Sequence, residues 1–300
     1  MELVVLAGGL GSRYGGLKQF EPVDDHNNFI LDYLVFDAIK LGASKVIFVI
    51  SPHSFSYFKN TVANKLSSHI KVDFAFQTNS QIPFPYYIPI NRKKPLGTAH
   101  ALLCAKPKIS QNFVVVNADD FYGYDALKCA FSFDKNLNQK TAGIVVYPAK
   151  NTLSLHGEVK RGVCEMSGSK ITNIVETKIQ RSGNHLLSLS PASGTISYLK
   201  SIKNDIFVSM NLLALSPEIL DLFEEEFLLF FKTHKHCLDT AEFFLPSVLT
   251  NLSNKKFISL VSIKTNSIWK GLTFQDDLNE VKNHIKSLKI ENKYPENLWE

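Results

Sequence analysis

The chain has 300 residues, of which 45% are hydrophobic and 20% charged, and its formal net charge at pH 7 is +5. The length is enough for one large α/β domain or two small ones, and the proportions are ordinary for a globular protein. The charge is spread without a dense lysine or arginine run, which disfavours nucleic-acid binding but suits phosphorylated small molecules. No secretory signal is evident, no apolar run reaches the roughly 18 residues of a membrane span, and the cysteines lack CxxC spacing. We therefore expect a cytoplasmic protein without disulfides or a zinc site.

The first half of the chain alternates short apolar runs with helical patterns. Continuous apolar runs suit strands that are buried on both faces of a mostly parallel sheet. After the first run, residues 30–41 carry a helical stripe, with Asn28 as a candidate N-cap and Gly42 as a stop signal. The alternation predicts a doubly wound, Rossmann-like α/β fold. The predicted strands cover residues 3–6, 45–50, 72–76, 113–116 and 144–147.

The pattern changes after Pro148. Short alternating runs there predict antiparallel strands, and residues 181–201 are polar enough to indicate a loop or insertion. Ser216 is a candidate N-cap for a helix whose first position is a proline. The strands are expected at residues 160–166, 171–176 and 206–213, and the helices at residues 217–231, 239–249 and 276–288.

The segment most informative for function is the glycine-rich run L-A-G-G-L-G-S-R-Y-G-G-L-K-Q at residues 6–19, which directly follows the first strand. Glycines let the backbone turn and let a phosphate approach the amides, and Arg13 and Lys18 add positive charge. A dinucleotide loop, G-x-G-x-x-G, would need glycine at Tyr14, and in a Walker A loop the lysine follows the glycine directly, where Leu17 intervenes. The run therefore predicts a phosphate-binding loop of another kind.

A second informative segment is the run at residues 113–116, which ends in Asn117-Ala118-Asp119-Asp120. Ligands bind at the carboxyl ends of parallel strands, and carboxylate oxygens suit Mg²⁺. A solvated turn or a cap for a helix near Tyr124 is the alternative reading of these acids.

The glycine-rich run resembles the signature loop of the sugar-1-phosphate nucleotidylyltransferases, which make NDP-sugars, more than the shorter loop of the molybdenum-cofactor guanylyltransferases. This resemblance implies a GT-A-like, doubly wound mixed sheet with antiparallel strands added in the second half. It also implies a catalytic domain over residues 1–235, with a C-terminal helical segment at 236–300 packed on it. In this family the loop holds the triphosphate, so Arg13 would contact phosphates and Lys18 would support the reacting phosphorus. Asp119 matches the family's magnesium-binding aspartate. The remaining implied nucleotide contacts in the loop are Leu6, Ala7, Gly8, Gly9, Gly11 and Ser12.

The resemblance extends to the base and acceptor sites. L-G-T-A-H-A at residues 96–101 resembles the family's base-reading segment, which implies roles for Gly97 and Thr98, with Gln77 as the candidate base-reading glutamine. We interpret His100 as a packing residue. R-G-V-C-E at 161–165 and I-V-E-T-K at 174–178 resemble the family's Y-G-V-V-E and E-K-P stretches, although Thr177 is inserted and the proline is absent. The implied acceptor-binding residues are Gly162, Glu176, Lys178 and Asn211.

One departure of this sequence from the family pattern concerns the metal site. Many family members carry a second metal-binding acid in a late W-x-D-x-G-like segment, and here Gly271 stands where that acid would fall. We therefore expect Asp119 to be the only strong protein carboxylate on the Mg²⁺, with the nucleotide supplying most other ligands.

The resemblance implies that an NMP passes from an NTP to a sugar 1-phosphate, with release of pyrophosphate. A CTP-dependent cytidylyltransferase acting on phosphocholine or another phosphorylated alcohol is one alternative, and a non-catalytic nucleotide-binding regulator is another. A nucleotide-sugar glycosyltransferase would need a D-x-D motif, whereas the acids here are adjacent. We expect an NTP and a phosphorylated small molecule as partners, without nucleic acid or membrane, and leave a homo-oligomer open.

Overall fold

The computed structural model describes residues 1–9, 20–79, 82–154, 157–182, 185–189, 196–201, 206–272 and 276–300. Within this part of the chain, every helix is too short or too polar to span a lipid bilayer.

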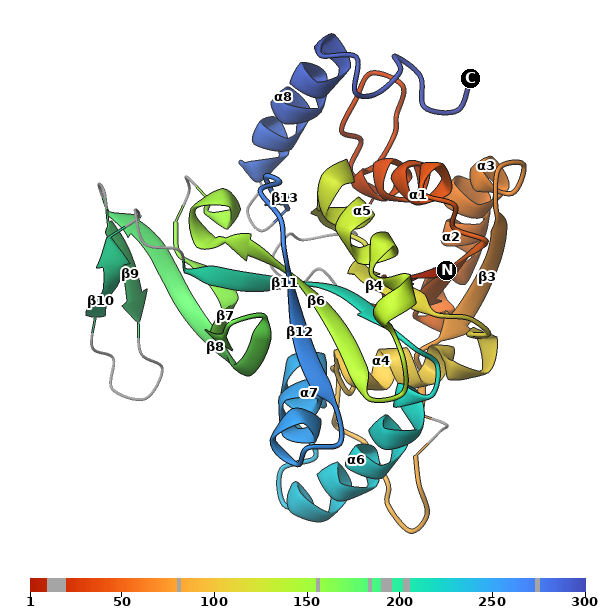
Figure 1. The fold of residues 1–300 in the computed structure, drawn as a ribbon. Coiled ribbons are helices and arrows are strands. Elements are labelled where there is room, and N and C mark those ends of the chain that lie inside the picture. Colours follow the sequence, from red (N-terminus) through yellow and green to blue (C-terminus); the bar gives the residue numbers. More distant parts are fainter. Residues whose placement is uncertain are drawn as a thin grey trace.

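A mixed 11-stranded sheet runs through the molecule (Figure 1). Its order is β10-β9-β8-β12-β6-β11-β4-β1-β2-β3, and β7 pairs with both β11 and β8. The four strands β3, β2, β1 and β4 are mutually parallel, whereas β11 runs antiparallel to β4, β6 and β7. The strands are β1 (Glu2–Leu6), β2 (Lys45–Ile50), β3 (Lys71–Phe76), β4 (Phe113–Asn117), β6 (Thr141–Pro148), β7 (Val159–Ser167), β8 (Lys170–Ser182), β9 (His185–Leu189), β10 (Ile196–Ser201), β11 (Phe207–Leu215) and β12 (Ser259–Lys264), with β5 (Asp120–Phe121) and β13 (Lys270–Gly271) forming a separate small pair.

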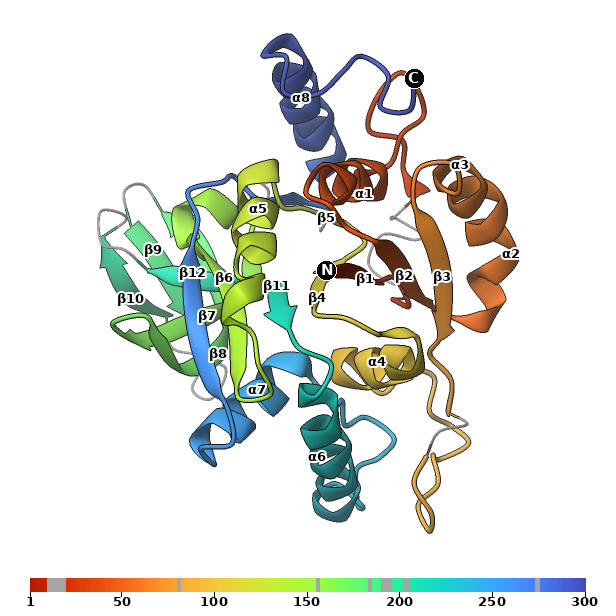
Figure 2. The same cartoon turned by 45° about the vertical axis from the view of Figure 1, so that its right-hand side comes forward.

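Helices cover both faces of this sheet (Figure 2). Strand residues alternate between the faces, so Leu3 and Val5 pack in the cluster that holds α1 and α5, while Val4 packs in the cluster that holds α4, α6 and α7. All six residues of β2 are buried, as the continuous apolar run predicts. The helices are α1 (Ile30–Lys40), α2 (Phe55–Phe58), α3 (Asn64–Leu66), α4 (Thr98–Ala105), α5 (Tyr124–Ser132), α6 (Ile219–Thr233), α7 (Leu245–Asn254) and α8 (Asp277–Ile290).

The ends of α1 only partly match the sequence expectation. Asn28 does not cap the helix, because the helix begins one residue later and Phe29 takes the cap position. The Asp32 carboxylate instead accepts the Phe29 backbone N–H at 2.7 Å, which satisfies an amide from within the first turn. Gly42 ends the helix as predicted, with a φ of 84° and its N–H donated to the Ile39 carbonyl at 2.9 Å.

Two later helices begin further along the chain than predicted. Ser216 does not cap α6, which begins at Ile219. The helix expected over residues 239–249 begins only at Leu245. Tertiary contacts hold the preceding segment in an irregular form, because the buried Arg92 guanidinium donates to the carbonyls of Leu238 and Ala241, each at 2.7 Å.

Residues 181–201 were predicted to be a loop or insertion, and the loop prediction is wrong for the part that the structure describes, which consists of strands. β8 extends to Ser182, and β9 and β10 continue the sheet to its edge. Polar segments can form strands at a sheet edge because backbone pairing there does not require a continuous apolar run.

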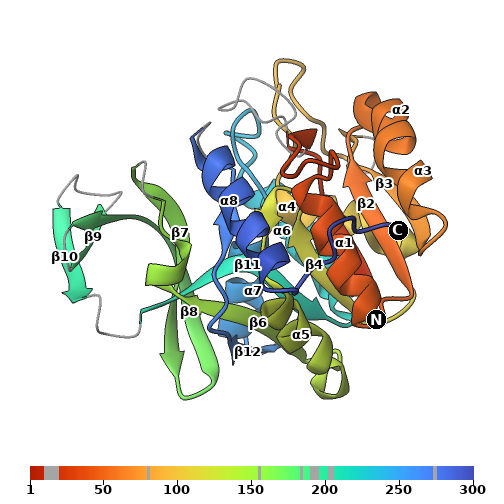
Figure 3. The same cartoon turned by 90° about the horizontal axis from the view of Figure 1, so that it is seen from above.

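The C-terminal part of the chain is an integral part of the sheet and of the helices that pack on it. β12 lies between β8 and β6 and runs parallel to β6, so residues 236–300 are not purely helical. α8 and the tail lie over the α1 side of the sheet (Figure 3), where Val281, Ile285 and Tyr294 pack with Ile30 and Tyr33. The division into residues 1–235 and 236–300 stays a prediction.

Candidate functional site

The candidate site lies at the carboxyl ends of β1 and β4, which are parallel neighbours with Leu6 opposite Asn117. The Ala118 N–H donates to the Leu6 carbonyl at 3.1 Å, and the Ala7 N–H donates to the Val49 carbonyl at 2.8 Å. The first residues of the glycine-rich run and the acidic turn therefore lie side by side, as the strand order predicts. Of the predicted loop contacts, Leu6, Ala7, Gly8 and Gly9 are described, whereas Gly11, Ser12, Arg13 and Lys18 lie outside the described residues.

The predicted base-reading residues come together beside Gly8. The Gln77 Nε2 donates to the Gly97 carbonyl at 2.9 Å, and a Cβ added to Gly8 would lie 2.9 Å from the Gln77 Oε1. Gly97 has a φ of 111°, and a Cβ there would come within 2.6 Å of the Phe243 carbonyl oxygen. Glycine is therefore required at this position by both conformation and space.

Two neighbours of this glycine also have structural roles. The Thr98 hydroxyl accepts the Leu245 N–H at 3.0 Å, which ties α4 to the start of α7. His100 is buried and stacks on Phe227, with ring centroids 5.2 Å apart, in agreement with its interpretation as a packing residue.

The two acids after β4 have different surroundings. Asp119 is half-buried, and its backbone carbonyl accepts the Leu272 N–H at 3.4 Å. Asp120 is buried, and its carboxylate accepts hydrogen bonds from the Asn117 Nδ2 at 2.8 Å and the Tyr122 hydroxyl at 3.2 Å. Asp120 thus belongs to a buried polar network, whereas the assignment of Asp119 as the metal ligand stays a prediction.

A cavity of about 320 Å³ opens next to these acids. The β7–β8 hairpin forms one wall, the turn after β4 another, and residues near the start of α7 a third. Three of the four predicted acceptor-binding residues line it. Its lining includes Thr98, Asn117, Asp120, Lys160, Arg161, Gly162, Glu176, Ser209, Asn211, Phe244 and Trp269.

Asn211 has an unusual backbone in this wall. Its φ is 60°, and it lies where the register between β11 and β6 shifts. A left-handed residue at a β-bulge turns its side chain away from the regular alternation, and such residues are frequent at functional sites. Its position is therefore consistent with the predicted contact to the acceptor.

Lys178, the fourth predicted acceptor residue, is absent from this lining. Its ammonium group instead pairs with Glu158 at 2.7 Å. Its cross-strand partner Lys160 lines the cavity, with Nζ 3.8 Å from Glu176. Lys160 lies two residues before Gly162 on the same strand face, a period-2 signal that the sequence reasoning missed.

Arg161 and Trp269 form a second feature that the sequence reasoning missed. The Arg161 guanidinium lies 4.5 Å from the Trp269 ring centre and donates from Nε to the Thr152 carbonyl at 3.0 Å. Burial lowers the pKa of Arg161 to about 10, and the charges of Asp120 and Asp277 counteract part of this effect. The guanidinium therefore remains charged at neutral pH, in the lining of the cavity.

The same tryptophan explains the absence of an acid at residue 271. A Cβ on Gly271 would lie 2.4 Å from the Trp269 ring and 3.0 Å from the Asp120 carboxylate, which is opposite Gly271 in the β5–β13 pair. A side chain at this position would therefore collide with both neighbours. An acid at residue 271 would therefore require the Trp269 ring to move.

The sheet topology defines a Rossmann-like α/β protein, a class in which ligands bind at the carboxyl ends of the parallel strands. A family model for nucleotidyl transferases matches residues 2–179, and the chain belongs to this family. The family prediction from the glycine-rich run is thereby confirmed.

Solved structures agree on the fold. An inositol-1-phosphate CTP transferase from T. maritima aligns with a TM-score of 0.63 and 15% identity, covering 95% of this chain and 96% of that one. A Bacillus anthracis protein described as a glucose-1-phosphate thymidylyltransferase, solved with sucrose, aligns with a TM-score of 0.63 and 13% identity, covering 95% and 94%. A UDP-glucose pyrophosphorylase complexed with UDP-glucose aligns with a TM-score of 0.59 and 15% identity, covering 95% of this chain and 98% of that one. Among curated proteins, no sequence match was found. The predicted GT-A-like, Rossmann-type mixed sheet is confirmed.

Proposed function

We propose that this nucleotidyltransferase transfers an NMP from an NTP to a sugar 1-phosphate, forming an NDP-sugar and pyrophosphate. The observation that carries the proposal is the polar cavity beside the end of β4. Glu176 and Asn211 offer oxygen and amide groups for sugar hydroxyls, and Lys160 offers a cation for the acceptor phosphate. A phosphorylated polyol therefore matches the lining better than an apolar acceptor.

The chemistry is an in-line displacement. An oxygen of the acceptor phosphate attacks the α-phosphorus, the bond from that phosphorus to the bridging oxygen of the β-phosphate breaks, and pyrophosphate leaves with the electron pair. Such a reaction depends on positioning and charge neutralisation. Arg13 and Lys18 are proposed to offset the negative charge on the transferred group and on pyrophosphate.

We propose that Mg²⁺ binds as a metal shared with the nucleotide. Among the described residues, no group of three or more His, Cys, Asp or Glu side chains gathers as a metal site. Asp119 is the proposed protein ligand, and phosphate oxygens and water would supply the rest, in keeping with the octahedral preference of Mg²⁺. Bound there, the ion would neutralise phosphate charge.

A CTP-dependent transfer to a phosphorylated alcohol is the second candidate. The T. maritima structure named for inositol 1-phosphate and CTP aligns with the same TM-score, 0.63, as the one described as a glucose-1-phosphate thymidylyltransferase. Inositol 1-phosphate and glucose 1-phosphate, the acceptors in these two names, are both cyclic polyol phosphates, which the same cavity chemistry would suit.

The test is pyrophosphate release with each NTP against sugar 1-phosphates, inositol 1-phosphate and phosphocholine. Turnover with a sugar 1-phosphate, lost in Lys18→Ala, supports the proposal. Turnover with inositol 1-phosphate or phosphocholine alone supports the second candidate. Nucleotide binding by calorimetry without turnover for any acceptor would indicate the non-catalytic regulator instead.

A further inference from the structure

Residues 82–92, between β3 and α4, form a loop that extends beyond the sheet beside α6 in both Figure 1 and Figure 2. Three large apolar side chains of this loop lie mostly in solvent: Phe84 is 96% exposed, Tyr87 78% and Ile90 99%. Single exposed apolar side chains are common on protein surfaces, but a cluster of large ones indicates a surface that binds another molecule.

The loop is held firmly although these side chains are exposed. The Arg92 guanidinium at its end donates to the carbonyl of Leu238 and to that of Pro95, each at 2.7 Å. The Tyr86 ring stacks on Phe231 of α6, with ring centroids 5.1 Å apart. Three of the eleven loop residues are prolines, which restrict the backbone further. A loop restrained in this way loses little conformational entropy when it binds, so its exposed side chains suit an interface.

An apolar groove of about 390 Å³ lies next to the loop and is lined by residues of α4 and α6. Its apolar lining consists of Pro83, Leu103, Pro107, Phe227 and Leu228. Pro83 belongs to the loop, so the groove and the loop are continuous. Leu228 and the next residue of α6, Leu229, are both exposed. The same end of the molecule therefore carries a projecting apolar loop and an apolar groove.

Charged side chains divide between these two features. Lys93 and Lys94 are exposed just after the apolar part of the loop. Glu224 and Glu225 are exposed on α6, and Glu224 pairs with Lys106 at 2.7 Å. Among the described residues, neither Lys93 nor Glu225 forms an ion pair. The end of the loop is therefore basic, whereas α6 presents an acid beside the groove.

We propose that this end of the molecule is a homodimer interface, in which the loop of each copy lies in the groove of the other. A patch that carries both a projection and the groove that receives it is self-complementary, as a contact about a two-fold axis requires. The same arrangement brings the basic end of each loop toward the acidic side of the other copy's α6, so apolar surface and charge are both matched. The interface goes beyond the proposed function, because it uses none of the residues assigned to catalysis.

Sedimentation velocity on the full chain, from about 1 to about 100 µM, gives the oligomeric state and the Kd. The test variants are Phe84→Ser and Ile90→Ser in the loop, and Leu228→Glu in the groove. Ile290→Ser on α8 is the matched control, because Ile290 is 73% exposed and lies outside both the loop and the groove. Circular dichroism checks that each variant folds.

We expect a dimer for wild type and for Ile290→Ser, and a Kd raised about tenfold or more in each test variant, the effect expected from one apolar side chain lost from an interface. Lys93→Glu and Glu225→Lys should each raise the Kd about threefold, and the double variant should restore it. A monomeric wild type would overturn the inference in favour of a different protein as the occupant of this surface. A dimer whose Kd is unchanged in the loop variants, or charge reversals whose effects simply add, would overturn it as well.

Discussion

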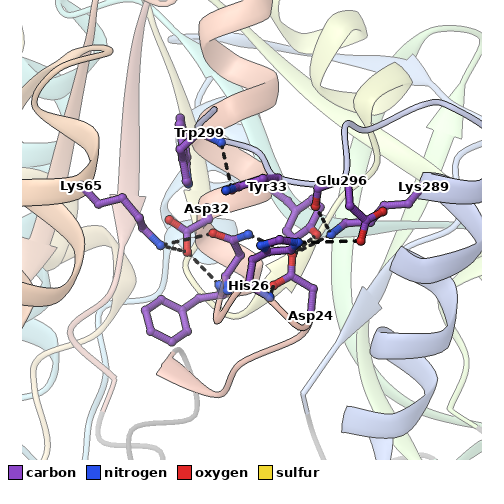
Figure 4. A network of polar contacts seen from close by, with 11 residues as sticks. Asp24, His26, Asp32, Tyr33, Lys65, Lys289, Glu296 and Trp299 are labelled. Carbon is purple, nitrogen blue, oxygen red and sulfur yellow. Dashed lines mark hydrogen bonds and ion pairs between the residues drawn. The ribbon is translucent and has the colours of Figure 1, made fainter.

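Asp24 is the centre of a polar network that joins the N-terminal half to the C-terminal helix (Figure 4). Its Oδ2 accepts hydrogen bonds from the Tyr33 hydroxyl at 2.6 Å and the Lys289 Nζ at 3.0 Å, and its Oδ1 accepts the backbone N–H groups of His26 and Asn28. The carboxylate therefore connects the turn before α1, the helix α1 itself, and α8.

The pKa of Asp24 gives the magnitude of this contribution. Burial alone would raise it, but the hydrogen bonds from Tyr33, Asn28 and Lys289 outweigh burial and lower the pKa from 3.8 to about 2. The Asp24 side chain is only 6% exposed, so solvent screens the effect little. This lowering of the Asp24 pKa corresponds to roughly 2–3 kcal/mol of folding free energy. Because the folded-state pKa is the lower one, this stabilisation is present above about pH 4 and is lost as the pH falls toward 2.

We expect Asp24→Asn to lower the free energy of unfolding at pH 7 by about 2–3 kcal/mol and the Tm by roughly 4 °C. The asparagine side chain has no negative charge, and it places an NH₂ group, which can only donate, next to the hydrogen-bond donors that the Asp24 carboxylate accepts from. Urea unfolding at pH 7 measures the effect, and Asp25→Asn is the matched control, because the neighbouring Asp25 is exposed. If the two variants differ by less than about 0.5 kcal/mol, the network does not stabilise the fold as argued.

Three further predictions concern the site and pH. Lys18→Ala should reduce kcat by roughly 100- to 1,000-fold with the fold intact; a near-normal kcat at saturating substrates would refute its role. Asp119→Asn should weaken the magnesium dependence of turnover more than Asp120→Asn, and magnesium titrations showing the reverse order would contradict the metal assignment. Burial raises the pKa of Asp37 to about 7 despite the Tyr294 hydroxyl bond, so its contribution should be present below about pH 4 and lost as the pH rises through 7. Urea unfolding across that pH range measures the free energy of unfolding of wild type and of Asp37→Asn. The wild-type value minus the variant value should fall as the pH rises, and a difference that stays constant would count against the prediction.

The parallel half of the fold was accessible from sequence because three of its four strands, β1, β2 and β4, are buried on both faces. The runs that form β2 and β4 are apolar over nearly their whole length, and the run of β1 leads directly into the glycine-rich segment. Such runs fix the strand positions and, through the rule for parallel strand ends, bring Gly8 near Asp119 without any knowledge of tertiary contacts.

The later half was less accessible because its boundaries depend on contacts between distant segments. Arg92 holds the segment before α7 through contacts with residues 146 and 149 positions away, and no local pattern around Leu245 records this. The same limitation affected the acceptor site. Lys160 and Lys178 face each other across the β7–β8 pair, and only the ion pair of Lys178 with Glu158 indicates which lysine is left for the cavity.

The replacement at residue 271 shows how one local departure changes the surrounding packing. With glycine there, the Trp269 ring occupies the space beside the strand, and the Asp120 carboxylate approaches the backbone of Gly271 across the β5–β13 pair. The Arg161 guanidinium over the ring then lies close enough to Asp120 for their charges to interact. The Trp269 ring and the buried Asp120 carboxylate thus border the space that a side chain at residue 271 would enter, and restoring an acid by Gly271→Asp would require displacing the tryptophan. This part of the site is therefore organised for packing and charge balance, in keeping with the prediction that Asp119 is the only strong protein carboxylate on the metal.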